Sequence, residues 1–396
     1  MTRTPGRRFA IALASISFIG PLAVHLFLPA IPAVKQALVL SDASAQLTFS
    51  IALFGMAFAT LAYGSLSDRH GRRPVLLSGL GLFLLGSIVS AAAHNMTLLV
   101  VGRLTQAVGA GCGITLVRTI ARDAYGPERL VKAIAYITMF YTLGPMIAPL
   151  VGGILIDALG WRSVFAFALV AGGAIFLAAF CWIYETHPKP ETVADGGSVL
   201  ANYRLLFGNA RFSALVLQTG FSTGTFLTLA TAASILMKEF LHRPSAEFGL
   251  YFLLFPIGFF CGNLVTSRVG TRLSTEKIVL AGSLVSSAGV AAEAAFVLAG
   301  HVTPLVLFLP GFFVTMAQGL ALPYAQSGAM ATVPRLAGTA SGIGVFVQHL
   351  CGAAFVQLYG VVANGTPRRM IVVAAFASAL CLTAGALPSV LARAKS

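Results

Sequence analysis

The fold is decided by residues 64–74, which read GSLSDRHGRRP. This short stretch holds two glycines, one acid and three arginines, and it contrasts with the apolar sequence on either side of it. The flanking segments, near 45–66 and 74–94, each reach the length of about 20 residues that a helix needs to cross the hydrocarbon core of a bilayer. The sequence therefore predicts a basic loop that joins two membrane-spanning helices.

Outward from this loop, ten more segments are long and apolar enough to span a membrane. They lie near 9–33, 97–120, 131–157, 162–184, 212–237, 246–268, 276–300, 303–325, 337–363 and 369–391. A long polar interval divides the chain into halves of nearly equal length, which indicates a duplicated six-helix unit. We predict an all-α membrane protein of twelve transmembrane helices in two pseudo-symmetric six-helix bundles, at 1–185 and 212–396, joined by a cytoplasmic linker at 186–211.

Composition excludes a soluble globule. Charged residues make up 10% and hydrophobic residues 57% of the 396 residues, and the mean hydropathy is +0.88. A soluble domain carries about 25% charged residues, because its surface faces water. The five cysteines lie within apolar runs and have no CxxC spacing, so neither a metal site nor a disulfide framework is predicted.

The basic residues indicate topology. An excess of 26 Lys and Arg over 12 Asp and Glu would suggest a nucleic-acid partner in a soluble protein. In a membrane protein such residues gather in cytoplasmic loops. With the N-terminus inside, eighteen of them fall in inner segments and six in outer loops. We therefore predict cytoplasmic N- and C-termini and no nucleic-acid partner.

The arginines of the 64–74 loop follow from its position beside the membrane, but its acid and its glycines need another explanation. The loop resembles the signature of the major facilitator superfamily, G-x-L-x-D-R-x-G-R-R/K, at every defined position. The resemblance implies a gating motif that locks the cytoplasmic helix ends together in the outward-facing state. Its acid would pair with an arginine near the end of helix 4 and with the N-terminus of helix 11, where the helix dipole favours a carboxylate. The expected gating residues are Gly64, Asp68, Arg69, Gly71, Arg72, Arg73, Arg118 and Arg122.

Helix 4 carries a charge within its span. An arginine there costs about 2.5–3.5 kcal/mol on insertion scales, so Arg103 needs a reason. It could extend to the nearby membrane interface, or it could be a cavity charge that binds an anionic group or tunes a proton carrier. Arg103 and Gln106 resemble the superfamily pattern R-x-x-Q-G, with Ala107 in the glycine position. That resemblance implies a role in proton coupling.

Helix 5 is rich in glycine and proline, which allows close helix contact and a bend. Small-residue packing would explain this composition by itself. The run also resembles the G-P-x-x-G-G motif of drug–proton antiporters, with Ala148 in the first glycine position. The residues expected to form this antiporter motif are Gly144, Pro145, Pro149, Gly152 and Gly153.

Within the superfamily, the chain resembles the Bcr/CflA (bicyclomycin and chloramphenicol resistance) group of drug:proton antiporters. The resemblance rests on LPAIP at 28–32, RDAY at 122–125, GWRSVF at 160–165 and AGTASG at 337–342. It implies a bacterial inner-membrane protein that acts as a monomer. One position departs from the group, because His25 stands where helix 1 usually has an acid. A histidine can titrate near neutral pH, so it could replace the acid as proton carrier, or coupling could have moved or been lost.

Helices 1, 4, 7 and 10 line the transport path in this superfamily. The expected coupling or cavity residues are His25, Arg103, Gln106, Phe140, Tyr141, Gln218, Ser222, Thr225, Gln318, Tyr324 and His349. The three on helix 7 follow i, i+4, i+7 spacing and form one polar stripe, which could equally serve helix–helix hydrogen bonds. Either histidine could also be neutral and bonded to a carbonyl. Glu293 is the one acid well inside a span, and we expect it near the headgroups.

The sequence thus predicts a secondary active transporter, with proton-coupled efflux of small drug-like or amphipathic compounds by alternating access. Alternatives are a metabolite or nutrient transporter of the same fold and a membrane sensor that does not transport. Because no Ser/His/Asp set or metal-ligand cluster is apparent in the spans, we do not predict an enzyme. The expected partners are a small-molecule substrate and the lipid bilayer. No cofactor is expected apart from the proton as coupling ion.

Overall fold

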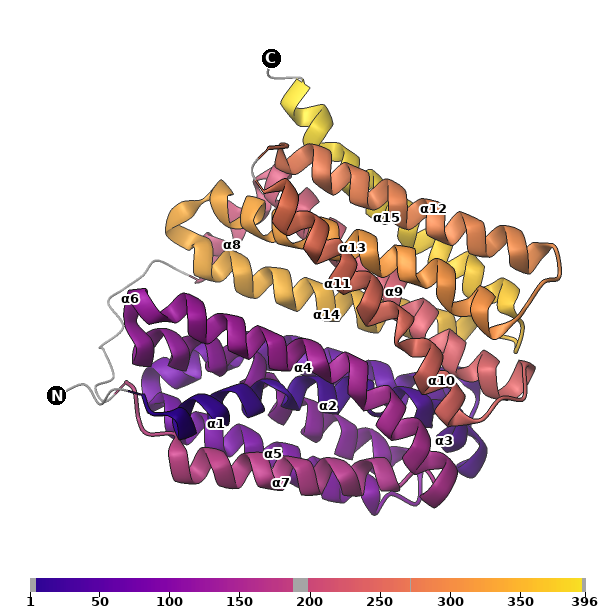
Figure 1. Ribbon diagram of the computed structural model, residues 1–396, viewed down its shortest axis with the longest axis horizontal. Coiled ribbons are helices and arrows are strands. Elements are labelled where there is room, and N and C mark those ends of the chain that lie inside the picture. The colour runs from indigo at the N-terminus through magenta and orange to yellow at the C-terminus, as the bar shows by residue number, and fades with distance from the viewer. Residues whose placement is uncertain (1–4, 188–198, 271, 394–396) are drawn as a thin grey trace. The chain divides into compact units, whose positions relative to one another are not determined.

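The computed structural model describes residues 5–187, 199–270 and 272–393. Within these residues the regular structure is entirely helical, and twelve helices are long and apolar enough to cross a membrane. The chain forms two compact units, Met1–Ala194 and Asp195–Ser396, shown in Figure 1 from indigo to magenta and from rose to yellow. The predicted all-α, twelve-span architecture is confirmed.

The first span is broken. Four pieces replace the single helix expected at 9–33: α1 (Arg7–Ser17), α2 (Ile19–His25), the 3-10 turn η1 (Leu28–Ala30) and α3 (Ile31–Ala37). Pro29 and Pro32 lie at the starts of the last two pieces. Proline lacks a backbone N–H and cannot donate within a helix. The break therefore falls directly after His25, in the middle of the predicted span.

The remaining spans of the first unit include one very long helix. The elements are α4 (Asp42–His70), α5 (Arg72–Ala91), α6 (Met96–Leu159) and α7 (Ser163–Trp182). The spans predicted at 97–120 and 131–157 are both present, but one helix, α6, continues through both over 64 residues. A straight helix of this length would measure about 96 Å, roughly three times the hydrocarbon thickness. Its two candidate spans, Met96–Tyr125 and Lys132–Leu159, are therefore two limbs joined by a helical bend.

The second unit begins within the predicted linker. Its elements are α8 (Val199–Phe207), α9 (Ala210–Ile235), the π-helical turn η2 (Leu236–Phe240), α10 (Ser245–Phe252), α11 (Leu254–Val269), α12 (Thr275–Leu298), α13 (Pro304–Thr332), η3 (Pro334–Leu336), α14 (Ala337–Val362) and α15 (Pro367–Arg393). Helix α8 was not expected from the sequence. Its Leu206 is fully buried in an apolar cluster with residues of α9, α12, α13 and α14. The short helix is thus part of the second bundle.

Local sequence sets the helix ends. Side-chain oxygens accept a backbone N–H of the first turn at Ser41, Asn95, Asn209, Ser274 and Thr303. Such caps satisfy donors that have no partner inside the helix. Glycines with positive φ end the helix that precedes the third span of each unit, at Gly71 (φ 91°) and Gly270 (φ 54°). Only glycine adopts these angles at little cost, so the two loops turn at corresponding positions.

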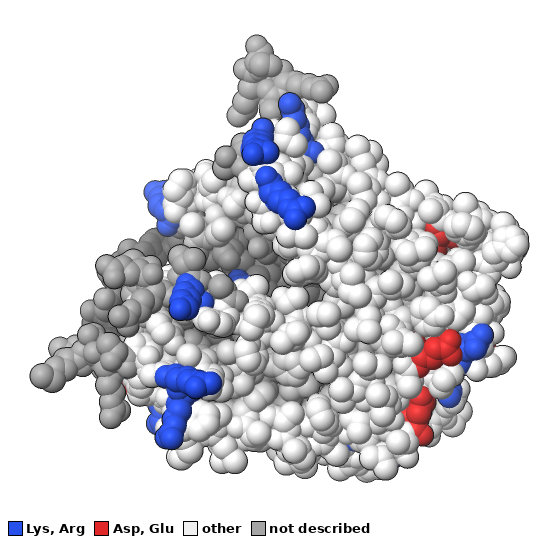
Figure 2. All heavy atoms as spheres, in the orientation of Figure 1, with Lys and Arg blue, Asp and Glu red and all other residues white. Residues whose placement is uncertain are grey.

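The outer surface of the helices suits lipid. Large apolar side chains are exposed along the spans, for example Val170 (74%) and Leu177 (61%) on α7 and Val361 (65%) on α14. Figure 2 shows a mostly uncharged surface, with the charged side chains of each unit gathered toward the ends of its helices. Because lipid does not require a charged coat, these exposed residues face the hydrocarbon rather than water.

Glycines let helices approach closely inside each unit. A Cβ added at Gly86 of α5 would overlap the backbone of Gln106 on α6. The second unit repeats this arrangement, since Gly262 of α11 lies against the carbonyl of Met316 on α13. Close approach of backbones is the main source of helix packing in a membrane, where lipid competes for apolar side chains.

Alanine at Gly86 should destabilise the protein, whereas alanine at Gly81 on the same helix should not. The first substitution forces α5 away from Gln106, and overpacking of this kind costs about 1–3 kcal/mol. A Cβ at Gly81 meets no described atom within 4 Å. Thermal unfolding of the purified variants in detergent measures the difference. Equal midpoints for the two variants would contradict the packing described here.

Candidate functional site

Arg72 is the centre of the loop between α4 and α5. Its guanidinium is hydrogen-bonded to Asp68 (2.5 Å), to the hydroxyl of Ser67 (2.6 Å) and to Asp123 on α6 (3.0 Å). Arg72 is only 4% exposed, although it begins a helix at the end of a span. Two carboxylates therefore neutralise one buried cation, and they connect the end of α4 to the first limb of α6.

Glu185 holds the other side of the same loop. It follows α7, and its two carboxylate oxygens accept the backbone N–H groups of Arg72 (2.9 Å) and Arg73 (3.1 Å) at the start of α5. A carboxylate there meets the positive end of the helix dipole. In return, the side chain of Arg73 donates to the carbonyls of Phe180 (2.9 Å) and Ile183 (2.8 Å) at the end of α7. The loop is therefore tied to both α6 and α7.

The observed pairing differs from the one expected for Asp68. Its partner is Arg72, within the loop, and among the described residues it forms no ion pair with Arg118 or Arg122. Arg122 is 67% exposed and contacts Asp123 instead, at 3.5 Å. The predicted pairing on helix 4 is thus wrong in this structure, because Arg72 is closer. The pairing with helix 11, which belongs to the second unit, stays a prediction.

Other loop residues have separate outcomes. Gly71 is required by its positive φ and by the nearby carboxylate of Glu185. A Cβ added at Gly64 would meet no described atom within 4 Å. Arg69 is exposed. Sequence reasoning missed Asp123 and Glu185 as partners. Asp123 belongs to the RDAY stretch at 122–125, and Glu185 directly follows a long apolar run.

Arg103 lies inside the first unit rather than at the membrane interface. It is 1% exposed, and its guanidinium packs over the ring of Phe27, 4.2 Å from the centroid. It donates to Gln106 Oε1 (2.6 Å), and Gln106 in turn donates to Ser87 on α5 (2.9 Å). The possibility that Arg103 extends to the interface is therefore wrong. Within the described part of the chain no carboxylate pairs with it, and its Nη2 has no hydrogen-bond partner.

The same arginine stabilises the break in the first span. It donates to the carbonyl of Ala23 near the end of α2 (2.9 Å) and to the carbonyl of Thr48 on α4 (3.2 Å). Carbonyls in the last turn of a helix have no partner within it. Arg103 supplies a donor at that place, two residues before half-buried His25. Two of the expected coupling residues, Arg103 and His25, thus belong to the same unit. Arg103 binds α2 two residues before His25.

The glycine-rich part of α6 packs on the broken helix. A Cβ at Gly144 would overlap Pro21, and one at Gly152 would lie 3.1 Å from Pro29 and close to the Leu26 carbonyl. Gly153 and Pro149 are buried, and Pro145 is partly buried. These contacts are those of small-residue packing, which was one of the two interpretations of this motif. They give the motif a specific neighbour, the break in span 1.

On helix α9 the polar stripe faces the interior of the second unit. Gln218 is 2% exposed and donates to Ser283 on α12 (3.2 Å), with Cys381 of α15 at 3.6 Å. Ser222 is 3% exposed, and Thr225 is fully buried and bonded to a carbonyl of its own helix. Of the stripe, Gln218 therefore joins helices within the bundle, as the packing interpretation predicts.

The remaining expected cavity residues have local partners. Gln318 donates to Thr223 on α9 at 3.1 Å. The Tyr324 hydroxyl donates to the Gly270 carbonyl after α11, so this tyrosine holds a loop. His349 contacts the carbonyl of Val345 on its own helix (2.9 Å). This contact matches the neutral, carbonyl-bonded histidine considered from the sequence.

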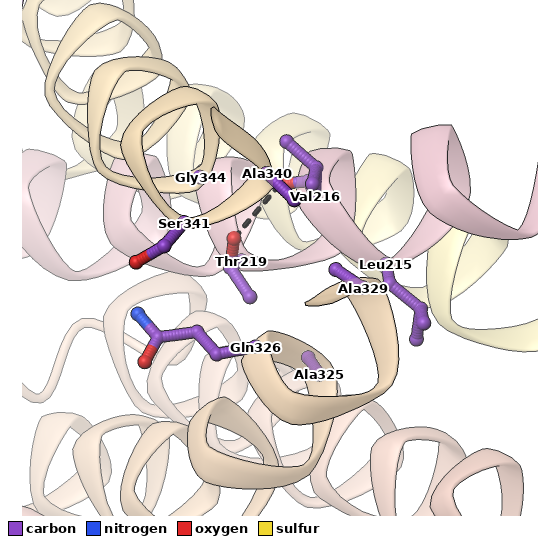
Figure 3. Close-up of a pocket in the computed structure, with 9 residues that line it drawn as sticks. All are labelled: Leu215, Val216, Thr219, Ala325, Gln326, Ala329, Ala340, Ser341 and Gly344. Atoms are coloured by element: carbon purple, nitrogen blue, oxygen red, sulfur yellow. Dashed lines mark hydrogen bonds between the residues drawn. The ribbon is translucent and has the colours of Figure 1, made fainter. Parts of the chain in front are cut away.

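Two aromatic residues were also expected to line the cavity. On the second limb of α6, Phe140 is partly buried and Tyr141 is 38% exposed. Figure 3 shows a small pocket between α9, α13 and α14, where Thr219, Gln326 and Ser341 are the polar lining residues. None of the expected cavity residues lines it. No group of His, Cys, Asp and Glu among the described residues could hold a metal ion.

Two units of six candidate spans, with an acid–arginine network in the loop after the second, define a polytopic membrane transporter. Residues 13–356 match the Major Facilitator Superfamily. The chain belongs to this superfamily and is a multi-pass membrane protein.

The sequence is similar to that of known proteins over nearly its whole length. It is 28% identical over 367 residues to "Multidrug resistance protein D" of Escherichia coli, covering 90% of each chain. It is 25% identical over 355 residues to "Bicyclomycin resistance protein homolog" of Haemophilus influenzae, covering 87% of each. Among solved structures, the POT family transporter PepTSo has a TM-score of 0.79 at 15% identity and 98% coverage of both chains. At that identity the likeness shows the fold alone.

Arg72→Ala should destabilise the first unit, and Arg69→Ala should leave its stability unchanged. The first change removes hydrogen bonds that connect α4 to α6, and a charged hydrogen bond contributes about 1.5–3 kcal/mol. Arg69 is an exposed arginine of the same loop and serves as the matched control. Thermal midpoints of both variants test this, and an unaltered midpoint for Arg72→Ala would show that the network is not stabilising.

Arg103→Lys should be more disruptive than its conservative character suggests. One ammonium cannot reach the Ala23, Thr48 and Gln106 acceptors together. A buried acceptor left without a donor costs about 1–3 kcal/mol. The midpoint of thermal unfolding should fall relative to Arg122→Lys, whose side chain is 67% exposed. If the two variants unfold together, Arg103 does not hold the break in span 1.

Proposed function

We propose that this protein is a proton-driven exporter of small drug-like or amphipathic compounds that works by alternating access. The observation that carries the proposal is the similarity to two proteins named for multidrug and bicyclomycin resistance, over 90% and 87% of the chain. A similarity that covers both six-helix units concerns the whole transport machine rather than one shared segment.

Proton coupling is assigned to the first unit near the break in span 1. Here Arg103 is a buried guanidinium whose described acceptors are neutral oxygens. Its positive charge disfavours a second cation nearby. His25 lies two residues beyond the Ala23 carbonyl to which Arg103 donates. The arrangement supports a proton carrier at His25 with Arg103 as the group that resets it.

The gating role is assigned to the network around Arg72. It contains two carboxylates and a buried arginine at the end of a span, and it connects α4, α5 and α6. Charged groups that can exchange partners suit a step in which helix ends separate and rejoin. Asp68, which is 54% exposed, is the member most free to change partner.

The substrate is proposed to be neutral or anionic rather than cationic. Among the described residues, Glu293 is the only fully buried acid, whereas Arg103 is a buried cation. A metabolite or nutrient transporter of the same fold is the second candidate, favoured by the same scarcity of buried acids. Neither candidate includes a catalytic activity or a nucleic-acid partner.

The proposed setting is the bacterial inner membrane, with both termini in the cytoplasm and the chain acting as a monomer. Support for the orientation comes from the loops after the second span of each unit, at 69–73 and 268–272, which hold five arginines. Positively charged loops are retained on the cytoplasmic side.

Proteoliposomes with a pH-sensitive dye inside should show proton flux when a transported compound is added across a pH gradient. A panel of neutral, anionic and cationic compounds identifies the substrate class. Flux should be lost in His25→Ala, because the proposed proton carrier is removed, and should persist in His242→Ala, which changes a histidine outside the spans.

Further outcomes separate the alternatives. Asp68→Asn should abolish transport while equilibrium binding of the compound persists, because the gate is altered and the binding residues are not. A wild-type protein that binds a compound yet moves no protons with any member of the panel would refute antiport. That result would favour a uniporter or a sensor.

A further inference from the structure

Glu293 is a buried acid without a partner. It lies on α12, five residues before Leu298 ends the helix. Its side chain is fully buried, and neither carboxylate oxygen has a hydrogen-bond partner among the described residues. The acid thus lies near the end of its span, as expected, but the bundle covers it completely. An ionised carboxylate without donors is very costly to bury, so the group is a neutral carboxylic acid in this state.

The neighbouring helices at this level are apolar. Helix α12 packs on α13 and α15 and contacts α9. One turn before Glu293, Gly289 lies against the Pro310 carbonyl of α13, and Ser287 is 3.0 Å from Ser378 of α15. In that register Glu293 is level with buried Leu307 and Phe308 of α13. Nothing in this apolar layer offers the carboxylate a charge.

The titratable groups on these helices lie elsewhere. They are Arg211 on α9, Tyr324 on α13, and Arg368, Arg369, Cys381 and Arg393 on α15. Arg211 pairs with Glu276 (2.7 Å), and Tyr324 bonds to the Gly270 carbonyl at the far end of α13. Cys381 is level with Ser283, ten residues before Glu293. Arg368 and Arg369 begin α15 and are exposed, so they mark the aqueous end nearest to the acid.

One carbonyl of the α13 backbone lacks its helical donor near this level. Pro310 lies inside α13 and has no N–H, so the carbonyl of Val306 loses its helical donor. Gly289 shows that this face of α13 is turned to α12. A neutral acid donates one hydrogen bond and an ionised one donates none. A carbonyl without a helical donor on this face of α13 would suit a protonated carboxylic acid better than an ionised one.

A line of buried polar groups leads away from the acid along α12. Ser286, seven residues earlier and hence on the same face, is 1% exposed and its hydroxyl has no partner. Beyond it, Ser283 accepts from Gln218. Over about 15 Å of helix, these hydroxyls and the amide could order water between Glu293 and the middle of the bundle.

We propose that Glu293 is a proton-binding site of the second unit, which holds one proton in the closed bundle and releases it when water reaches the α12–α13 interface. Binding adds a proton to a carboxylate oxygen, and release returns it to water, so no other reactant is required. This deepens the proposed function, on which its role in transport rests, because it assigns a second proton site besides His25. It also gives a reason for a lone acid in an otherwise apolar layer.

Infrared spectroscopy of the purified protein tests the protonation directly and does not depend on transport. At neutral pH the wild-type spectrum should contain the C=O stretching band of a protonated carboxylic acid, and Glu293→Gln should lose it. Glu247→Gln is the matched control, since Glu247 is partly exposed and lies 3.8 Å from Arg243, so the band should remain. A band that is absent in the wild type, or that survives Glu293→Gln, overturns the proposal.

Proton flux in proteoliposomes tests the role in transport. Glutamine imitates the protonated acid and cannot release a proton, so Glu293→Gln should bind the compound but lose compound-driven flux, while Glu247→Gln keeps it. Normal flux in Glu293→Gln overturns the coupling role. If the wild type shows the acid band but no flux, the proposed antiport fails and proton binding at Glu293 stands. If Glu293→Gln does not fold, Glu293→Asp must retain an acid band at a shifted frequency, and its absence overturns the proposal.

Discussion

Hydrocarbon offers no water to satisfy a backbone N–H or C=O group, so every departure from a continuous helix needs a partner from the protein. The break in span 1 is the clearest case. The end of α2 leaves carbonyls of its last turn without a helical donor, and Arg103 donates to one of them, at Ala23. Gly152 on α6 then lies against the Leu26 carbonyl. A costly buried arginine and a glycine-rich helix thus have one common explanation, the broken helix that both support.

The same constraint explains where charge is found. In the described residues, carboxylates that are paired lie at helix ends, where Asp68 and Asp123 neutralise Arg72 and Glu185 caps α5. Glu293 is the exception, since it is fully buried and has no hydrogen-bond partner. Paired groups form a network that can rearrange by exchange of partners. An unpaired acid responds instead by gaining or losing a proton. The second unit contains both kinds of carboxylate, since its Glu276 pairs with Arg211.

Much of the architecture could be predicted from the sequence because it depends on local properties. Apolar length identifies a span, and a polar interval separates the units. The structure departs from these expectations where the outcome depends on how one segment continues into, or contacts, another. The segments expected at 97–120 and 131–157 continue into one another as the single helix α6. Asp68 was predicted to pair with an arginine on helix 4. It pairs instead with Arg72, four residues further along the chain.

The sequence by itself determined the number of spans, the superfamily and the positions of the loop, helix 4 and helix 5 motifs. These are encoded in composition and spacing along the chain. Only the tertiary structure decided which atoms meet: that Glu185 caps α5, that Gln218 faces Ser283 and that Glu293 lies in an apolar layer. The first two are contacts between residues far apart in the sequence. The third is a matter of burial. Helix rotation decides all three, and inside an apolar bundle a sequence without strong amphipathicity leaves that rotation open.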